Sequence, residues 1–291
     1  METKQFTCLN GRFVLAHRAA VSVDDRGFRF GDGVFETIRV ERGTPVYWEA
    51  HMQRLAEGLR ALRITLPLAP LQPFARKLLL KNEAREGFLR IAVSRGVGSR
   101  GYLPHPPGMP ASWVMEWLAR PHTDAPAATL WLSSLAKIPP QCLPTQHKLA
   151  QGLNSTLALM EAQANGADEA LQLTPSGELA EASSANLFWL HGGTLHTPAL
   201  ETGCLGGTTR AAILRLAPYP TKLVQAGLSD LQGAEAVFLT NTRVGVQPVK
   251  ALQPAGWQFN ATHFIHRQML ALLTTDRLKD VMANRAAWSH A

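Results

Sequence analysis

Strand and helix patterns follow one another along the first 119 residues of the chain. Residues 13–23 (FVLAHRAAVSV) and 34–48 (VFETIRVERGTPVYW) have β-like composition, and the glycine-rich residues 24–33 (DDRGFRFGDG) between them predict a turn. Apolar residues from Met52 to Leu62 recur at spacings of three and four, which predicts an amphipathic helix. The pattern continues with a second helix over residues 71–85 and with strands that begin at residues 88 and 111.

A segment poor in hydrophobic residues interrupts this pattern at residues 120–128 (RPHTDAPAA), and we predict that it is a linker. Beyond it, Leu149, Leu153, Leu157, Met160 and Ala164 predict one face of a helix that ends at Gly166. The remaining patterns predict strands at 169–173, 186–190, 194–198, 234–240 and 247–252 and helices at 208–216 and 262–273. We therefore predict two α/β or α+β domains, a small one at residues 1–119 and a larger one at residues 129–291.

Charge and cysteine content narrow the function classes. The chain has 291 residues and a net charge of +7, but its lysines and arginines are scattered, which argues against a nucleic-acid surface and favours small acidic molecules as partners. Its three cysteines are far apart and form no C-x-x-C pair, which is typical of a reduced, cytoplasmic protein. No apolar run approaches the length of a membrane span, and no targeting segment or membrane partner is expected.

The common short motifs are missing, and a few scattered candidates remain. Metal-ligand spacings, G-x-S-x-G, the phosphate-binding P-loop and G-x-G-x-x-G do not occur, so we expect no metal site. The segment SRGVGSRGY (residues 94–102) is either a solvated turn or a binding site for an anionic molecule. Lys148 stands at the start of the predicted helix, and Glu181 stands in a predicted turn before an apolar strand. CLGGTTR (residues 204–210) is a phosphate cradle or ordinary helix capping.

Seven blocks occur in order along the chain: DRGFRFGDGVFETIRV, HMQRL, Lys148, GADEALQL, LAEASSANLFWLHGGTLHTP, LGGTTR and AEAVFLTNTRVGVQPV. Together they resemble the fold-type IV pyridoxal-phosphate enzymes, the class IV aminotransferase family. This family includes branched-chain aminotransferases, D-amino acid transaminases and 4-amino-4-deoxychorismate lyases. The resemblance implies a small N-terminal domain, a larger C-terminal domain with pyridoxal 5'-phosphate between them, and a homodimer.

The same resemblance implies roles for individual residues of the cofactor site. Lys148 matches the lysine that bonds to the cofactor and moves the substrate proton, which requires an amine that is partly neutral. Glu181 matches the acidic partner of the pyridine nitrogen, which strengthens the ring as an electron sink. The phosphate contacts that the resemblance implies are Arg54, the backbone N–H groups of Thr208 and Thr209, and the hydroxyl of Thr242.

Within the family, SRGVGSRGY resembles the corresponding segment of the aminodeoxychorismate lyases. Their substrate carries two carboxylates, and Arg90 and Arg100 are the candidates to bind them, while Arg95 serves the turn. Thr37 is a candidate proton donor beside Lys148, and Phe35 and Asn241 are candidate substrate contacts.

The branch of the family decides the expected reaction. The lyases release pyruvate and form p-aminobenzoate, a step of folate biosynthesis. Gln151 departs from the lyase pattern, which has asparagine there. Tyr102 replaces the histidine of the D-amino acid transaminases, and Leu153 replaces a tyrosine of the branched-chain enzymes. The resemblance therefore predicts a lyase, with a transaminase of D-amino acids or branched-chain amino acids as the alternative.

Overall fold

The computed structural model describes residues 5–104, 106, 108–120 and 125–289. Its internal contacts divide the chain into two units. The first unit comprises Met1–His122, His147–Gln151 and Arg277–Ala291, and the second comprises Thr123–Gln146 and Gly152–Asp276. Of the predicted linker, residues 121–124 lie outside the described residues, and Ala128 already begins a strand. Both units combine sheets with helices, so the predicted α/β class is confirmed.

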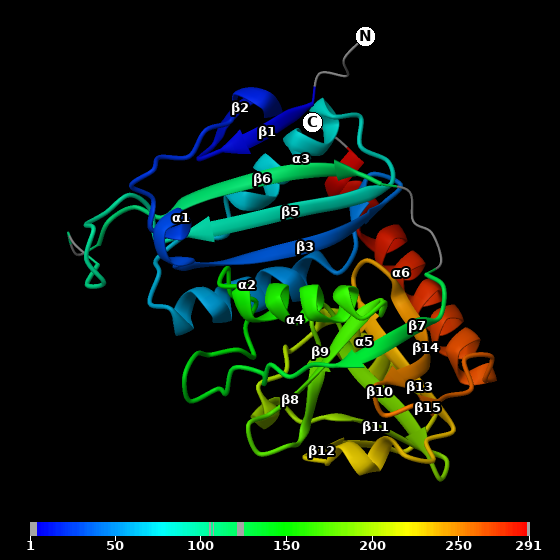
Figure 1. Ribbon diagram of the computed structural model, residues 1–291. Coiled ribbons are helices and arrows are strands. Elements are labelled where there is room, and N and C mark those ends of the chain that lie inside the picture. The colour runs from blue at the N-terminus through cyan, green and yellow to red at the C-terminus, as the bar shows by residue number, and fades with distance from the viewer. Residues whose placement is uncertain (1–4, 105, 107, 121–124, 290–291) are drawn as a thin grey trace. The chain divides into compact units, whose positions relative to one another are not determined.

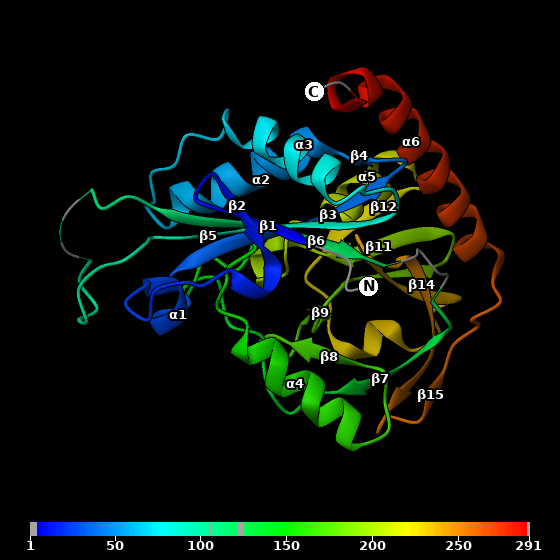
Figure 2. The same cartoon turned by 90° about the horizontal axis from the view of Figure 1, so that it is seen from above.

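The first unit is built on an antiparallel sheet of six strands in the order β2-β1-β6-β5-β3-β4 (Figure 1). Along β3, Val34, Ile38 and Val40 are buried in the core, whereas Phe35 and Thr37 lie on the half-exposed face. Helices α2 and α3 cover the buried face, on the same side of the sheet (Figure 2). The bounds are β1 Phe6–Leu9, β2 Arg12–Leu15, β3 Gly33–Glu41, β4 Thr44–Pro45, β5 Gly87–Ser94, β6 Ser112–Ala119, α2 Trp48–Ala61 and α3 Leu71–Lys81.

Two expectations for the N-terminal segment were wrong. The predicted strand over residues 13–23 ends at Leu15 and continues as a 3-10 helix, Ala16–Arg18. The predicted turn over residues 24–33 contains helix α1, Arg26–Phe30. Asp25 caps this helix by accepting a hydrogen bond from the Gly27 N–H, and Gly31 ends it at a φ of 65°. A cap and a left-handed glycine are helix signals as much as turn signals, which is why composition alone misassigned this segment.

The sequence predicted that Lys148 stands at the start of a helix, and this prediction is wrong. Its carbonyl accepts a hydrogen bond of 2.9 Å from the Phe35 N–H, and Leu149 forms a bridge with Val34 of β3. Helix α4 begins only at Leu153 and ends at Ala164. Lys148 therefore lies on an extended segment that adds to the first unit's sheet.

The apolar positions predicted as one face of α4 do not form its buried face. Leu153, Leu157 and Met160 are exposed, whereas Ala158 and Ala162 are fully buried. The alanines pack with Trp131 of β7 (Ala128–Leu132) and Ala170 of β8 (Glu169–Leu173), because small side chains let a helix approach strands closely. The spacing of the apolar residues predicted the helix correctly, but it did not predict which face of the helix is buried.

The second unit contains a nine-stranded sheet in the order β12-β11-β10-β13-β14-β7-β8-β9, with β15 paired to β14. Glu181 lies in β9 and is buried, so the predicted turn at this residue is wrong. The predicted C-terminal helix is confirmed and extends further, as α6 (Phe264–Ser289). The other bounds are β7 Ala128–Leu132, β8 Glu169–Leu173, β9 Leu179–Ala182, β10 Asn186–His191, β11 Thr194–Pro198, β12 Thr221–Val224, β13 Ala236–Asn241, β14 Gly245–Gln253, β15 Trp257–Gln258 and α5 Thr208–Leu216.

Within the described residues, none of the helices combines the length and the apolar character that crossing a bilayer requires.

Candidate active site

The half-exposed face of the first unit's sheet brings together a hydroxyl, an aromatic ring and two cations. Thr37 of β3 lies directly opposite Arg90 of β5 in the antiparallel register, so both side chains point to one face. The Lys148 Nζ lies 4.4 Å from the centroid of the Phe35 ring, and the Arg90 Cζ lies 4.6 Å from it. Arg90 keeps 43% of its side chain exposed, with Glu116 Oε2 4.0 Å away. This face can therefore accept an anion beside an amine.

The opposite, buried face of the same strand holds a charged cluster that the sequence did not predict. The Glu36 carboxylate accepts hydrogen bonds of 2.8 and 2.6 Å from Arg54 Nε and Nη2, and its Oε2 lies 2.6 Å from His51 Nδ1. His51 and Arg54 are three residues apart on α2, so they lie on one face of that helix. The alternation along β3 puts Glu36 on the buried side, and that alternation was the signal available in the sequence.

The cluster is charged mainly through Glu36 and Arg54. Burial opposes the charge of Glu36, but His51 and Arg54 together lower its pKa to about 2. Burial also lowers the pKa of His51, so a neutral imidazole donates from Nδ1 to the carboxylate at neutral pH. Arg54 is thus buried with its guanidinium bound in a fork to Glu36, and a role in phosphate binding for Arg54 stays a prediction.

The arginines of SRGVGSRGY separate into two kinds. Arg95 donates to both oxygens of Asp32, at 2.7 and 2.8 Å, and to the carbonyls of Leu62 and Arg63. Arg100 is exposed and forms no ion pair with any residue that the structure describes. Arg95 therefore holds the strand exit, and Arg100 remains the candidate of this pair for an outside ligand.

In the second unit, three donors surround Glu181. Its Oε1 accepts a hydrogen bond of 2.6 Å from Lys137 Nζ, and its Oε2 accepts bonds of 3.0 Å from Asn186 Nδ2 and from the Leu205 N–H. The carboxylate is buried, with 6% of the residue exposed. A carboxylate accepts about four hydrogen bonds, so three donors leave room for one more, such as a pyridinium N–H. Lys137 was not found from the sequence, because nothing in the short loop around it marks it.

The N-terminus of α5 is tied to this carboxylate through Asn186. Asn186 Nδ2 also donates to the Leu205 carbonyl at 2.8 Å. A Cβ on Gly207 would stand only 2.1 Å from Asn186 Oδ1, so only glycine fits at this position. Gly207 caps α5 without a side-chain hydrogen bond, and Thr208 and Thr209 begin the helix. The first N–H groups of a helix have no acceptor inside it and favour anions. The close approach at Gly207 thus fixes the N-terminus of α5 beside Glu181, and phosphate contacts at Thr208 and Thr209 stay predictions.

The remaining predicted residues, Asn241 and Thr242, lie at the end of strand β13. Asn241 is engaged in the turn between β13 and β14, where its Oδ1 accepts from the N–H groups of Arg243 and Val244 and its Nδ2 donates to the Ser184 carbonyl. Thr242 comes directly after this strand and is half-buried. A substrate contact for Asn241 and a phosphate contact for Thr242 stay predictions.

Taken unit by unit, these donors fit pyridoxal phosphate. The second unit offers a buried carboxylate with one remaining acceptor position and a helix N-terminus for a phosphate dianion. The first unit offers the Lys148 amine beside an aromatic ring. The chemistry of this donor set matches the aldehyde, the ring nitrogen and the phosphate of that group.

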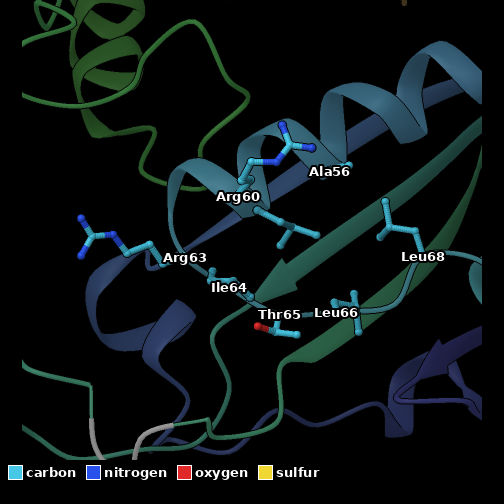
Figure 3. A pocket seen from close by; sticks show the side chains of 8 residues that line it. Ala56, Arg60, Arg63, Ile64, Thr65, Leu66 and Leu68 are labelled. Carbon is cyan, nitrogen blue, oxygen red and sulfur yellow. The ribbon is translucent and has the colours of Figure 1, made fainter.

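A surface pocket lies elsewhere, at the C-terminal end of α2 (Figure 3). Leu59, Ile64, Leu66 and other apolar side chains line it, and the guanidinium of Arg63 points away from them. None of the predicted site residues lines this pocket. Across the part of the chain that the structure describes, no cluster of three or more metal-ligating side chains occurs.

The chain belongs to the amino-transferase class IV family, because the family model matches residues 33–252. A 246-residue match at 32% identity, covering 83% of this chain and 85% of the relative, links it to the "Putative branched-chain-amino-acid aminotransferase" of Methanocaldococcus jannaschii. Relatives named aminodeoxychorismate lyase and D-alanine aminotransferase also match.

Two solved structures identify the fold and the cofactor. The 4-amino-4-deoxychorismate lyase from Pseudomonas aeruginosa is 30% identical, with a TM-score of 0.79 over 93% of this chain and 98% of that chain. A branched-chain amino acid aminotransferase from the organism abbreviated T.th., complexed with N-(5'-phosphopyridoxyl)-L-glutamate, is 29% identical, with a TM-score of 0.83 over 96% and 97%. The predicted fold-type IV class and the predicted cofactor, pyridoxal 5'-phosphate, are confirmed.

Proposed function

We propose that this chain is a 4-amino-4-deoxychorismate lyase that works as a cytoplasmic homodimer. The observation that carries the proposal is the placement of Arg90 opposite Thr37, on the face where the Lys148 ammonium contacts Phe35. A substrate with two carboxylates and a ring fits a face of cations and an aromatic side chain. Arg90 and Arg100 would bind the carboxylates, and Phe35 would contact the ring.

The proposed reaction needs two proton transfers, one from the substrate and one to the departing group. Pyridoxal phosphate supplies an electron sink for the charge that develops on the carbon bonded to the substrate nitrogen. Lys148 removes the proton from that ring carbon, and the C–O bond to the enolpyruvyl group breaks. Protonation of the departing enolpyruvate by Lys148 or Thr37 gives pyruvate, and the ring becomes aromatic p-aminobenzoate. Glu181 holds the ring nitrogen, while Arg54, Thr208, Thr209 and Thr242 hold the phosphate.

The second candidate is a transaminase of branched-chain or D-amino acids. Gln151 departs from the lyase pattern, and relatives with aminotransferase names match over more than four fifths of the chain. Both reactions begin with the same proton removal by Lys148, so the substrate pocket decides between them.

One experiment separates the two candidates. The purified protein is incubated with aminodeoxychorismate, and in parallel with leucine or D-alanine plus 2-oxoglutarate. Equal amounts of p-aminobenzoate and pyruvate support the lyase, and glutamate formation without p-aminobenzoate contradicts it. Lys148→Ala is the control, and it should abolish either activity and the attachment of cofactor after borohydride reduction.

A further inference from the structure

Helix α1 carries an arginine whose contacts the proposed reaction does not use. Arg26 is buried, with 3% of the residue exposed, although it lies on a helix of five residues. Its Nη1 donates to the carbonyls of Gly101 and Ser99, at 2.7 and 3.3 Å, and its Nη2 donates to the carbonyl of Tyr102 at 2.8 Å. One guanidinium thus binds three backbone carbonyls of the loop that carries Arg100.

The guanidinium is itself fixed from the other side. Arg26 Nε donates to Asp32 Oδ2 at 2.9 Å, and Asp32 also binds Arg95 through both of its oxygens. The Arg26 guanidinium lies 4.7 Å from the centroid of the Phe30 ring, and that ring lies 5.5 Å from the ring of Tyr102. The carboxylate and the aromatic ring leave the guanidinium a single orientation, which is toward the loop.

The backbone of α1 is docked on the same strand exit. The Arg26 N–H donates to the Gly96 carbonyl at 2.9 Å, and Asp25 forms a bridge with Val97. Figure 1 shows α1 at the end of β5, where the loop leaves the sheet. The side chains at the loop tip are in contrast exposed, as Tyr102 and Leu103 show. The loop therefore has few packing contacts of its own, and its shape depends on the carbonyls that Arg26 binds.

We propose that Arg26 is a positioning residue that holds the loop Ser99–Tyr102 in one conformation and thereby aims Arg100 at an anionic substrate. The effect on substrate rests on the proposed function, whereas the effect on the loop does not. Arginine is suited to this position because its planar fork donates five N–H bonds in fixed directions, and lysine has no such fork. Arg26→Lys keeps the charge beside Asp32 but cannot reach all three carbonyls.

The loop is tested without substrate, in the cofactor-loaded enzyme. Amide hydrogen exchange of residues 98–103 and trypsin cleavage after Arg100 are compared in the unaltered protein, Arg26→Lys and Arg26→Met. We expect both variants to exchange and to be cleaved about tenfold faster. The matched control is Arg29→Met on the same helix, because Arg29 binds Asp24 and the Val23 carbonyl and not the loop. Cofactor absorbance and far-UV circular dichroism identify a variant that has not folded. If Arg26→Met has not folded, the exchange and cleavage rates of Arg26→Lys decide the test.

Kinetics test the consequence for the substrate. In Arg26→Lys, KM for aminodeoxychorismate should rise about tenfold while kcat stays within about twofold, since Arg26 does not touch the reacting atoms. Unchanged loop exchange and cleavage in both variants overturn the proposal. A loosened loop with unchanged KM also overturns it, because Arg26 then stabilises the fold only. If the unaltered protein shows no lyase activity, the proposed function fails, and the exchange and cleavage rates still decide whether Arg26 holds the loop.

Discussion

The Glu36 carboxylate and the Arg54 guanidinium bind each other in a fork, through hydrogen bonds of 2.8 and 2.6 Å, on the buried side of β3. Removing one member of such a buried pair leaves the other charge without compensation. Arg54 is at the same time the predicted phosphate ligand, so Glu36 fixes the orientation of its guanidinium. If Arg54 binds the cofactor phosphate as predicted, this pair connects the stability of the first unit with cofactor binding.

The first prediction concerns acid stability. Folding lowers the pKa of Glu36 from its ordinary 4.5 to about 2, so its contribution to stability is fully present above pH 4.5 and is lost as the pH falls toward 2. The contribution corresponds to about 3 kcal/mol. Urea unfolding at pH 5 and pH 3 measures it. In Glu36→Gln the free energy of unfolding should be lower at pH 5 and should fall less between the two pH values.

The matched control for this measurement is Glu57→Gln, which removes a carboxylate of α2 that lies outside the cluster. It should retain the full loss of stability between pH 5 and pH 3. An equally steep loss in Glu36→Gln would show that another carboxylate carries the acid sensitivity.

The second prediction tests the close approach at Gly207. A Cβ there would stand 2.1 Å from Asn186 Oδ1, so Gly207→Ala must displace the amide that binds Glu181 and the Leu205 carbonyl. We expect the affinity for pyridoxal phosphate, measured by equilibrium dialysis, to fall at least about tenfold, as for the loss of one charge-assisted hydrogen bond.

Its control lies one residue earlier. A Cβ on Gly206 would stand 3.4 Å from the Gln146 carbonyl, an ordinary contact. Gly206→Ala should therefore bind the cofactor nearly as well as the unaltered protein. If both alanine variants lose the cofactor equally, the glycines serve loop flexibility and not the packing of Asn186.

The third prediction concerns Lys137, whose Nζ lies 2.6 Å from Glu181 Oε1. Lys137→Met leaves a buried carboxylate without its cation, which costs about 3–5 kcal/mol. The cofactor-free variant should therefore melt at a lower temperature than the unaltered protein. Pyridoxal phosphate supplies a positive ring nitrogen, so its addition should raise the Tm of Lys137→Met more than that of the unaltered protein. Equal gains in Tm would show that Lys137 and the cofactor do not share Glu181.

Local patterns in the sequence predicted α2, β3 and α5 well, because the spacing of apolar residues lies within each segment. The extended segment at Lys148 could not be predicted in this way. Its hydrogen-bond partner, Phe35, lies more than 100 residues away, and no local pattern reports such a pairing. The resemblance supplied the candidate site residues, while the contacts of Glu36, Lys137 and Arg26 depend on tertiary packing.

The last prediction concerns Arg90, which lies opposite Thr37 and 4.6 Å from the Phe35 ring centroid. If Arg90 binds a substrate carboxylate, Arg90→Met removes a charge-assisted interaction of about 1.5–3 kcal/mol, and kcat/KM for aminodeoxychorismate should fall roughly tenfold to a hundredfold. Cofactor absorbance should not change, because Arg90 is not among the predicted cofactor contacts. Arg12→Met is the control, since Arg12 is an exposed arginine of β2 in the same sheet, and it should keep full activity. Full lyase activity in both Arg90→Met and Arg100→Met would mean that the substrate carboxylates are bound by other residues.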